Sequence, residues 1–199
     1  GVSAAEIKAT VCASKAEWAE EADVLMEGGR NARIAVVVPD AVGSSWGDNY
    51  VYVDLALVVP DTIELDVRDS SGDIEISRVG SVAVKDSSGD IDIDSSGSVS
   101  LSDSSGDIEL NGIDGDVTVV QDSSGDIRGR DIKGGVIVAR DSSGDIRFQD
   151  VRDDFVVERD SSGDIVARTV GGDFAVLRDG SGEVRYEDVA GSVQVPDDD

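Results

Sequence analysis

The sequence predicts an all-β protein in which short strands are coiled into a parallel β-solenoid, and three observations support this prediction. The string Asp-Ser-Ser-Gly-Asp-Ile occurs six times, at steps of 17 or 19 residues. Between its copies, apolar residues alternate with polar ones over short segments, which is typical of strands. A unit of this size is too small to fold alone, so the units are expected to stack as the rungs of one solenoid.

Each repeat unit combines one turn with two strands. In residues 141–159 the turn sequence comes first, and apolar residues then alternate over 146–151 and again over 155–157. Asp, Ser and Gly favour turns, and Gly at the fourth position permits a positive φ. Each rung of 17–19 residues is therefore expected to hold two strands, a bend and a Ser-Ser-Gly turn. The copies start at Asp69, Asp86, Asp103, Asp122, Asp141 and Asp160, and a degenerate copy, Asp-Gly-Ser-Gly-Glu-Val, starts at Asp179.

Energetics and side-chain volumes both favour stacking. Five buried apolar side chains contribute roughly 8–15 kcal/mol, whereas ordering the backbone of one rung costs on the order of 17–38 kcal/mol. Stacked rungs would lie about 4.8 Å apart and share one interior. In one interior column, Gly129, Phe148, Ala167 and Tyr186 alternate between small and large, as close packing requires. We expect residues 61–196 to form this solenoid as a single continuous domain.

Residues 1–60 lack the repeat, and we expect them to form irregular, longer early rungs and a cap instead of an independent domain. Apolar residues alternate over 7–11, over 34–38 and over 51–59, where the strand is expected to continue through Pro60 to residue 67. Ser14 and Glu17 fit a capping box for a short helix over 15–21, and Gly28-Gly29 fits a turn. Four aromatic residues could cover the open end of the solenoid: Trp18, Trp46, Tyr50 and Tyr52.

The composition excludes several classes of function. The chain of 199 residues has 43 acidic and 17 basic residues, a formal net charge of -26, no His and one Cys. Binding to nucleic acid is not expected, because it depends on Lys and Arg. Without His there is no Ser-His-Asp triad, and Cys12 alone cannot form an internal disulfide or a multi-thiolate zinc site. No apolar segment approaches the roughly 20 residues that span a bilayer.

The paired aspartates of the turns suggest a calcium site. Stacking would place them in two files, a file being a column of equivalent residues on successive rungs. Carboxylates about 4.8 Å apart repel each other, and calcium, which binds six to eight oxygens, would relieve this repulsion. Alternatively, the first Asp accepts backbone N–H bonds in an Asx turn, with no ion. The predicted ligands are Asp69, Asp86, Asp103, Asp122, Asp141 and Asp160 in the first file and Asp73, Asp90, Asp107, Asp126, Asp145 and Asp164 in the second.

We expect neither enzymatic activity nor any cofactor other than this calcium. Paired carboxylates are the catalytic groups of glycosidases, but here the pair recurs on every rung, whereas an active site should occur once. A basic file lies directly before the turns and is expected to compensate the acidic charge at the surface. Its members are Lys85, Arg140, Arg159 and Arg178.

Residues 58–67, Val-Val-Pro-Asp-Thr-Ile-Glu-Leu-Asp-Val, are followed by serial Ser-Ser-Gly-Asp-Ile, and together they resemble a family of bacterial extracytoplasmic repeat proteins described as adhesins. That family is grouped with the head-GIN and toastrack-like domains. The resemblance covers roughly residues 5–195 and implies a β-solenoid rich in Gly-Asp-Ile/Val in the bacterial envelope, whether periplasmic, on the cell surface or secreted. Toastrack-like relatives also resemble envelope-stress or cell-surface sensing modules. The family supplies no catalytic residues.

These observations predict a non-enzymatic extracytoplasmic scaffold that presents an acidic Asp/Ser ladder to a protein or cell-surface partner. A sensory or regulatory ectodomain of a membrane-tethered protein is the alternative from another class, and a calcium-stabilised structural scaffold is the third. Unpaired strand edges at the solenoid ends would also allow self-association, which the strong net charge opposes in low salt.

Overall fold

The computed structural model describes residues 5–29, 31–39 and 50–196. Contacts divide the chain into two compact units, Gly1–Pro60 and Asp61–Asp199. In the described ranges, no helix is long and apolar enough to cross a membrane.

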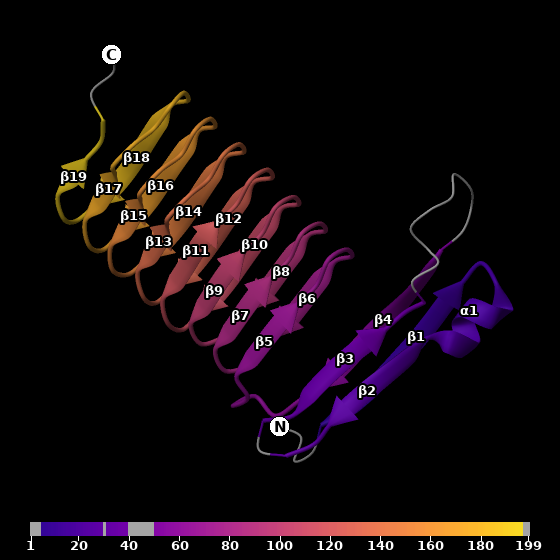
Figure 1. The fold of residues 1–199 in the computed structure, drawn as a ribbon. Coiled ribbons are helices and arrows are strands. Elements are labelled where there is room, and N and C mark those ends of the chain that lie inside the picture. Colours follow the sequence, from indigo (N-terminus) through magenta and orange to yellow (C-terminus); the bar gives the residue numbers. More distant parts are fainter. Residues whose placement is uncertain (1–4, 30, 40–49, 197–199) are drawn as a thin grey trace. The chain divides into compact units, whose positions relative to one another are not determined.

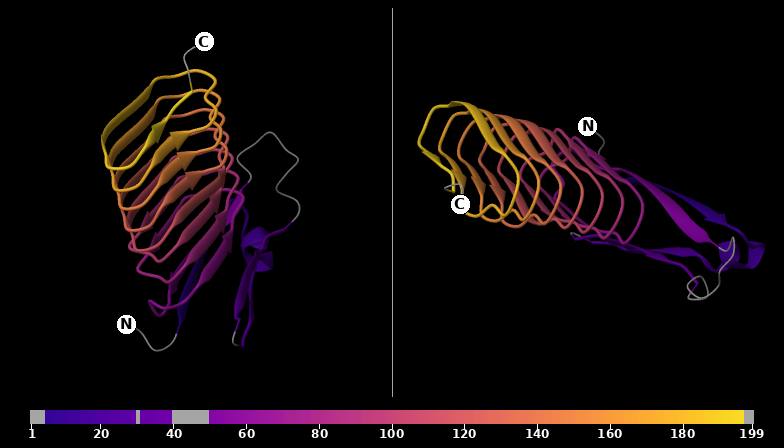
Figure 2. Two further views of the ribbon diagram at one scale, coloured as in Figure 1. Left: turned by 90° about the vertical axis from the view of Figure 1, so that its left-hand side faces the viewer. Right: turned by 90° about the horizontal axis from the view of Figure 1, so that it is seen from above.

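The second unit is a parallel β-solenoid with two sheets (Figure 1), which confirms the predicted fold class. The chain passes alternately from one sheet to the other, and the coiled path is visible in both views of Figure 2. The seven-stranded sheet contains β6 (Ile74–Ser77), β8 (Ile91–Asp94), β10 (Ile108–Ile113), β12 (Ile127–Ile132), β14 (Ile146–Val151), β16 (Ile165–Val170) and β18 (Val184–Val189). The eight-stranded sheet contains β5 (Leu65–Arg68), β7 (Val82–Lys85), β9 (Val99–Ser102), β11 (Val117–Gln121), β13 (Val136–Val138), β15 (Phe155–Val157), β17 (Phe174–Val176) and β19 (Val193–Gln194).

The core lies between the two sheets and is built from columns of equivalent residues in register. Leu110, Gly129, Phe148, Ala167 and Tyr186 pair in order across five strands of the seven-stranded sheet, as the volumes predicted. A Cβ on Gly129 would lie 2.1 Å from Cε1 of Phe148, so the large ring requires a glycine beside it. The aromatic rings continue across the interior, because Phe148 and Phe155 on opposite sheets lie 5.0 Å apart between centroids, in the range of favourable aromatic pairs. Phe155 and Phe174 on adjacent strands lie 5.3 Å apart.

The turn glycine is required by close contact between rungs. Gly144 has a φ of +128°, and a Cβ on it would lie only 1.7 Å from the carbonyl oxygen of Gly125 on the preceding rung. Equivalent glycines with positive φ occur in each turn from Gly72 to Gly182. Both the backbone conformation and the packing therefore exclude a side chain at this position, as the turn sequence predicted.

The first unit differs from the sequence prediction, because its strands pair antiparallel and so are not rungs. β1 (Glu6–Ala13) pairs with β4 (Val51–Val58), and β2 (Asp23–Glu27) pairs with β3 (Arg33–Val37). β4 ends at Val58 instead of continuing to residue 67, and β2 was not predicted. The capping role of this unit stays a prediction, and Trp46 lies outside the described residues.

The predicted capping box is also wrong. The helix α1 (Ala16–Glu21) has Lys15 at its N-cap, with no capping hydrogen bond from a side chain. The Ser14 hydroxyl instead accepts a hydrogen bond from Tyr50 N–H at 3.0 Å and lies 3.3 Å from the Tyr50 carbonyl oxygen. Ser14 therefore joins two segments of this unit that are distant in sequence.

Candidate functional site

The first Asp file is buried inside the solenoid, so it does not form part of the predicted acidic surface. Five members are at most 2% exposed: Asp86, Asp103, Asp122, Asp141 and Asp160. Asp69, on the first rung, is exposed. The cause is the strand pattern, since Val84 points inward, Lys85 outward and Asp86 inward again.

Each buried carboxylate has fewer hydrogen bonds than it has oxygens to satisfy. Asp86 and Asp103 each accept one from the next residue's backbone N–H at 2.6 Å, and Asp122 does so at 2.7 Å. The Asx turn, which was the alternative to calcium, bonds the N–H two residues on, and Asp160 has this bond, from Ser162 N–H at 3.2 Å. The other oxygen, Oδ2, has no partner in these three residues or in Asp160, and neither oxygen of Asp141 has one.

Burial changes the acidity of this file. It raises the pKa of Asp122 to about 6, and the neighbouring Asp103 carboxylate adds to the increase. It raises the pKa of Asp141 to about 7, helped by the charges of Asp160 and Asp122. Burial likewise raises the pKa of Asp160 to about 6. Part of the file therefore carries protons near neutral pH, and the formal charge of -26 overstates the charge of the folded chain.

The second Asp file has a different role, because it extends the hydrogen-bonded ladder between rungs. The Oδ1 atom of each member accepts the backbone N–H of the equivalent residue one rung later. Asp126 accepts from Asp145 N–H at 2.8 Å, and Asp145 accepts from Asp164 N–H at 2.7 Å. The same bond joins Asp73 to Asp90, Asp90 to Asp107, Asp107 to Asp126 and Asp164 to Glu183.

Arginines on the outer face of the seven-stranded sheet neutralise this second file. Arg128 bridges Asp107, at 2.9 Å, and Asp126. Arg147 bridges Asp126, at 3.5 Å, and Asp145 in the same way. The backbone N–H of Asp126 and the Arg128 guanidinium together hold the pKa of Asp107 below its usual value. The next rung has Val166 in place of an arginine. On the rung after it, Arg185 pairs with Asp164 and Glu183.

Sequence reasoning missed these arginines and assigned charge compensation to a different file. Among the described residues, no ion pair involves Lys85, Arg140, Arg159 or Arg178. A signal was present in the sequence, because Arg128 and Arg147 each follow the second Asp of a turn by two positions. In a strand, residues two positions apart lie on the same face, so this spacing predicts adjacent charges.

The two Asp files do not converge on a metal centre in the structure. Over residues 5–29, 31–39 and 50–196, no three Asp, Glu, Cys or His side chains are grouped so that they could hold a metal ion. One file lies inside the solenoid, and the other uses its oxygens for backbone N–H groups and arginines. Calcium binding stays a prediction.

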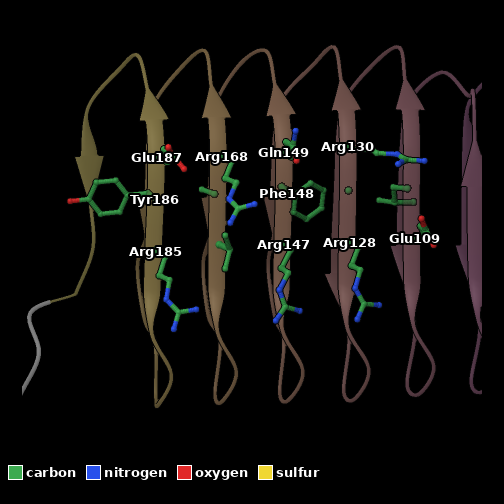
Figure 3. Close-up of a pocket in the computed structure, with 14 residues that line it drawn as sticks. Glu109, Arg128, Arg130, Arg147, Phe148, Gln149, Arg168, Arg185, Tyr186 and Glu187 are labelled. Atoms are coloured by element: carbon green, nitrogen blue, oxygen red, sulfur yellow. The ribbon is translucent and has the colours of Figure 1, made fainter.

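A shallow depression of about 550 Å³ crosses β10 to β18 on the outer face of the seven-stranded sheet. Figure 3 shows Arg128, Arg147 and Arg185 along one side of it. A second row contains Arg130, Gln149, Arg168 and Glu187. Arg130 donates to Asn111 Oδ1 at 2.9 Å, and no ion pair involves Arg130 or Arg168 in the described part of the chain. The arrangement can bind anionic or polar groups.

The stacked rungs and the repeated charged faces define a solenoid repeat protein. The model of the Toastrack family (DUF4097) matches residues 20–187, and the chain belongs to that family. No curated protein and no solved structure matches the chain.

Proposed function

We propose that this Toastrack protein is a non-enzymatic extracytoplasmic scaffold of the adhesin type, which binds a protein or cell-surface partner through the outer faces of its solenoid. The observation that carries the proposal is that the depression's side chains lie in register across β10 to β18, with Arg128, Arg147 and Arg185 in one row and Arg130 and Arg168 in the other. A surface of this kind suits an extended partner, because its arginines recur along the solenoid axis on rungs about 4.8 Å apart.

The acidic ladder expected from the sequence is not the surface we propose for binding. Its first file is buried, and its second file is bonded to backbone N–H groups and arginines. The arginines that lack carboxylate partners in the described ranges are better candidates, because an incoming anionic group would not have to displace an existing ion pair. Arg130 and Arg168 meet this condition in the depression.

A binding experiment with a matched control tests the proposal. Fluorescently labelled protein should bind saturably to bacterial envelope fractions, and the variant R130Q/R168Q should bind at least about tenfold more weakly, since two charged contacts are lost. The control is R33Q/R152Q, which removes the same charge from exposed arginines outside the depression. Equal loss in both variants, or no saturable binding by the unmodified protein, would contradict the proposal.

Fractionation of the native protein tests its location and the sensory alternative. A periplasmic, cell-surface or secreted protein supports the scaffold proposal, whereas recovery in the cytoplasm contradicts it. The buried, proton-binding Asp file favours the second candidate, a membrane-tethered sensory or regulatory ectodomain, because its protonation couples folding to external pH. That candidate requires the protein to remain in the membrane fraction after a high-salt wash.

A further inference from the structure

The outer face of the eight-stranded sheet has an acidic edge, an aliphatic centre and a basic edge. Asp116, Asp154 and Asp173 are exposed directly before β11, β15 and β17. Side chains in the centre are exposed to water, with Val120 at 47%, Ile137 at 42% and Leu177 at 49%. One exposed acidic residue, Glu158, interrupts this aliphatic centre on the rung before Leu177. Arg140, Arg159 and Arg178 form the other edge, where each directly precedes the first Asp of a turn.

Register places each edge in a straight file along the solenoid. Val117, Val136, Phe155 and Phe174 pair in order, so the residues directly before them also align. At the basic edge, the carbonyl oxygens of Arg140 and Arg159 accept N–H bonds at 2.9 Å from the preceding rung. The strand direction thus runs from acid to base on β15 and β17, whereas the rung of β13 has Gly135 in the acidic file and the rung of β11 has Gln121 in the basic file.

These edge charges lack ion-pair partners within the solenoid, although each of the three aspartates accepts a backbone N–H from the next rung. Across residues 61–196, no ion pair involves the three arginines of the basic edge or the three aspartates of the acidic edge. The seven-stranded sheet provides the contrast, because there Arg128, Arg147 and Arg185 each bridge two carboxylates. Arginines stacked on adjacent rungs repel one another, so acidic groups from another molecule would stabilise them.

We propose that this face is an interface between two copies of the chain, related by a two-fold axis parallel to the solenoid axis. Such a rotation keeps each rung at its height and reverses the strand direction. Arg159 of one copy then faces Asp154 of the other, and Arg178 faces Asp173. The aliphatic centres meet in the middle, and every contact occurs twice, as an isologous interface requires.

The available area fits a weak and specific dimer. The face measures roughly 17 Å from acidic to basic edge and about 34 Å along eight strands, which gives about 600 Å² per copy and about 1,200 Å² in total. This is the low end for specific interfaces. The net charge of -26 opposes association, so the dimer should be most evident near about 0.15 M salt, where long-range repulsion is screened.

Analytical ultracentrifugation over about 10–500 µM protein tests the proposal, because dissociation constants of weak dimers lie in this range. The unmodified chain should shift from monomer to dimer. R159E and D154R should each weaken dimerisation at least about tenfold, because each places like charges opposite one another. The combined variant D154R/R159E should restore the dimer, since the exchanged charges again face opposite charges.

Two controls keep the outcome decisive. R168E makes the same charge change on the other sheet and should leave the dimer intact. Because the Asp154 carboxylate also accepts Asp173 N–H at 2.7 Å, D154N is included, which keeps an acceptor oxygen and removes the charge. Circular dichroism verifies that each variant is folded.

A monomer at every concentration overturns the proposal. A dimer that R159E and D154R leave unchanged also overturns it, and indicates contact through another surface such as the solenoid ends. The proposal does not depend on envelope binding, and either can fail alone.

Discussion

Two aspartates of the same turn, four residues apart, have opposite environments. Asp141 is buried, has no hydrogen-bond partner for either oxygen, and has a pKa raised to about 7 by desolvation and its neighbours in the file. Asp145 lies at the surface, binds a backbone N–H and Arg147, and has a pKa held below its usual value. The comparison shows that the chemistry of a repeated residue is decided by the face of the strand on which it lies. The same residue type in a repeated motif can therefore stabilise the fold in one file and destabilise it in the other.

The largest expected effect comes from the glycine that lies between the two aspartates. Gly144→Ala should destabilise the solenoid by about 3 kcal/mol or more, because the new Cβ would clash with the Gly125 carbonyl oxygen at a positive φ. Urea denaturation measures the change. Gly28→Ala is the control, since a Cβ there meets nothing within 4 Å and should have little effect. Equal stability of both variants would contradict the rung spacing.

The surface file should be sensitive to loss of its side chain. Asp126→Ala removes the acceptor for Asp145 N–H and a partner of Arg128 and Arg147, so we expect a loss of about 1–3 kcal/mol in urea denaturation. Asp126→Asn keeps an acceptor oxygen and should lose less. If the two variants are equally destabilised, the backbone bond contributes little.

Replacement of an Asp in the buried file should instead increase the stability of the folded chain. Asp141→Asn removes a carboxyl group that is costly to ionise, and its amide can donate to the unpaired oxygens of Asp122 and Asp160. We therefore expect a gain of about 1–2 kcal/mol at about pH 8. Asp131→Asn, at an exposed position near the end of β12, is the matched control and should be neutral. A destabilised Asp141→Asn would show that the ionised carboxylate is needed.

Stability should also fall as pH rises across the range in which the buried file ionises. The folded-state pKa values of Asp122, Asp141 and Asp160 are raised to about 6, 7 and 6, above the unfolded value near 4. Their contribution is therefore complete below about pH 4 and is lost as pH rises to about 7. Thermal unfolding between about pH 5 and 8 should give a melting temperature that falls with pH, and a flat profile would contradict proton binding by the file.

The smallest expected effect is that of calcium. Oxygens of the second file already accept N–H groups and pair with arginines, and the first file is buried. Addition of millimolar calcium to chelator-treated protein should shift the melting temperature by less than about 1 °C, because stabilisation requires tighter binding to the folded state. A rise of several degrees would support the calcium-stabilised scaffold instead.

The repeat made the solenoid predictable. The alternation of inward and outward residues within it also predicts which Asp file is buried and which is exposed. Asp90 precedes the inward Ile91 and so points outward, whereas Asp86 lies two positions after the inward Val84 and so points inward. That step follows from period two alone. The antiparallel pairing of Glu6 with Val58 could not be predicted in this way, because residues 1–60 contain no repeat to indicate which segments are neighbours.

The side-chain hydrogen bonds that join successive turns have one polarity along the chain, opposite to that of the backbone bonds beside them. The carboxylate oxygen that receives the Asp145 N–H belongs to Asp126, one rung earlier, and the Ser143 hydroxyl donates to the Ser123 carbonyl, also one rung earlier. During synthesis from the N-terminus, each new rung therefore finds the acceptors of its turn's side-chain bonds, and the donors of its turn's backbone bonds, already in place on the preceding rung. Folding can proceed vectorially, one rung at a time, and unfolding under a pulling force applied at the C-terminus would remove rungs in the reverse order.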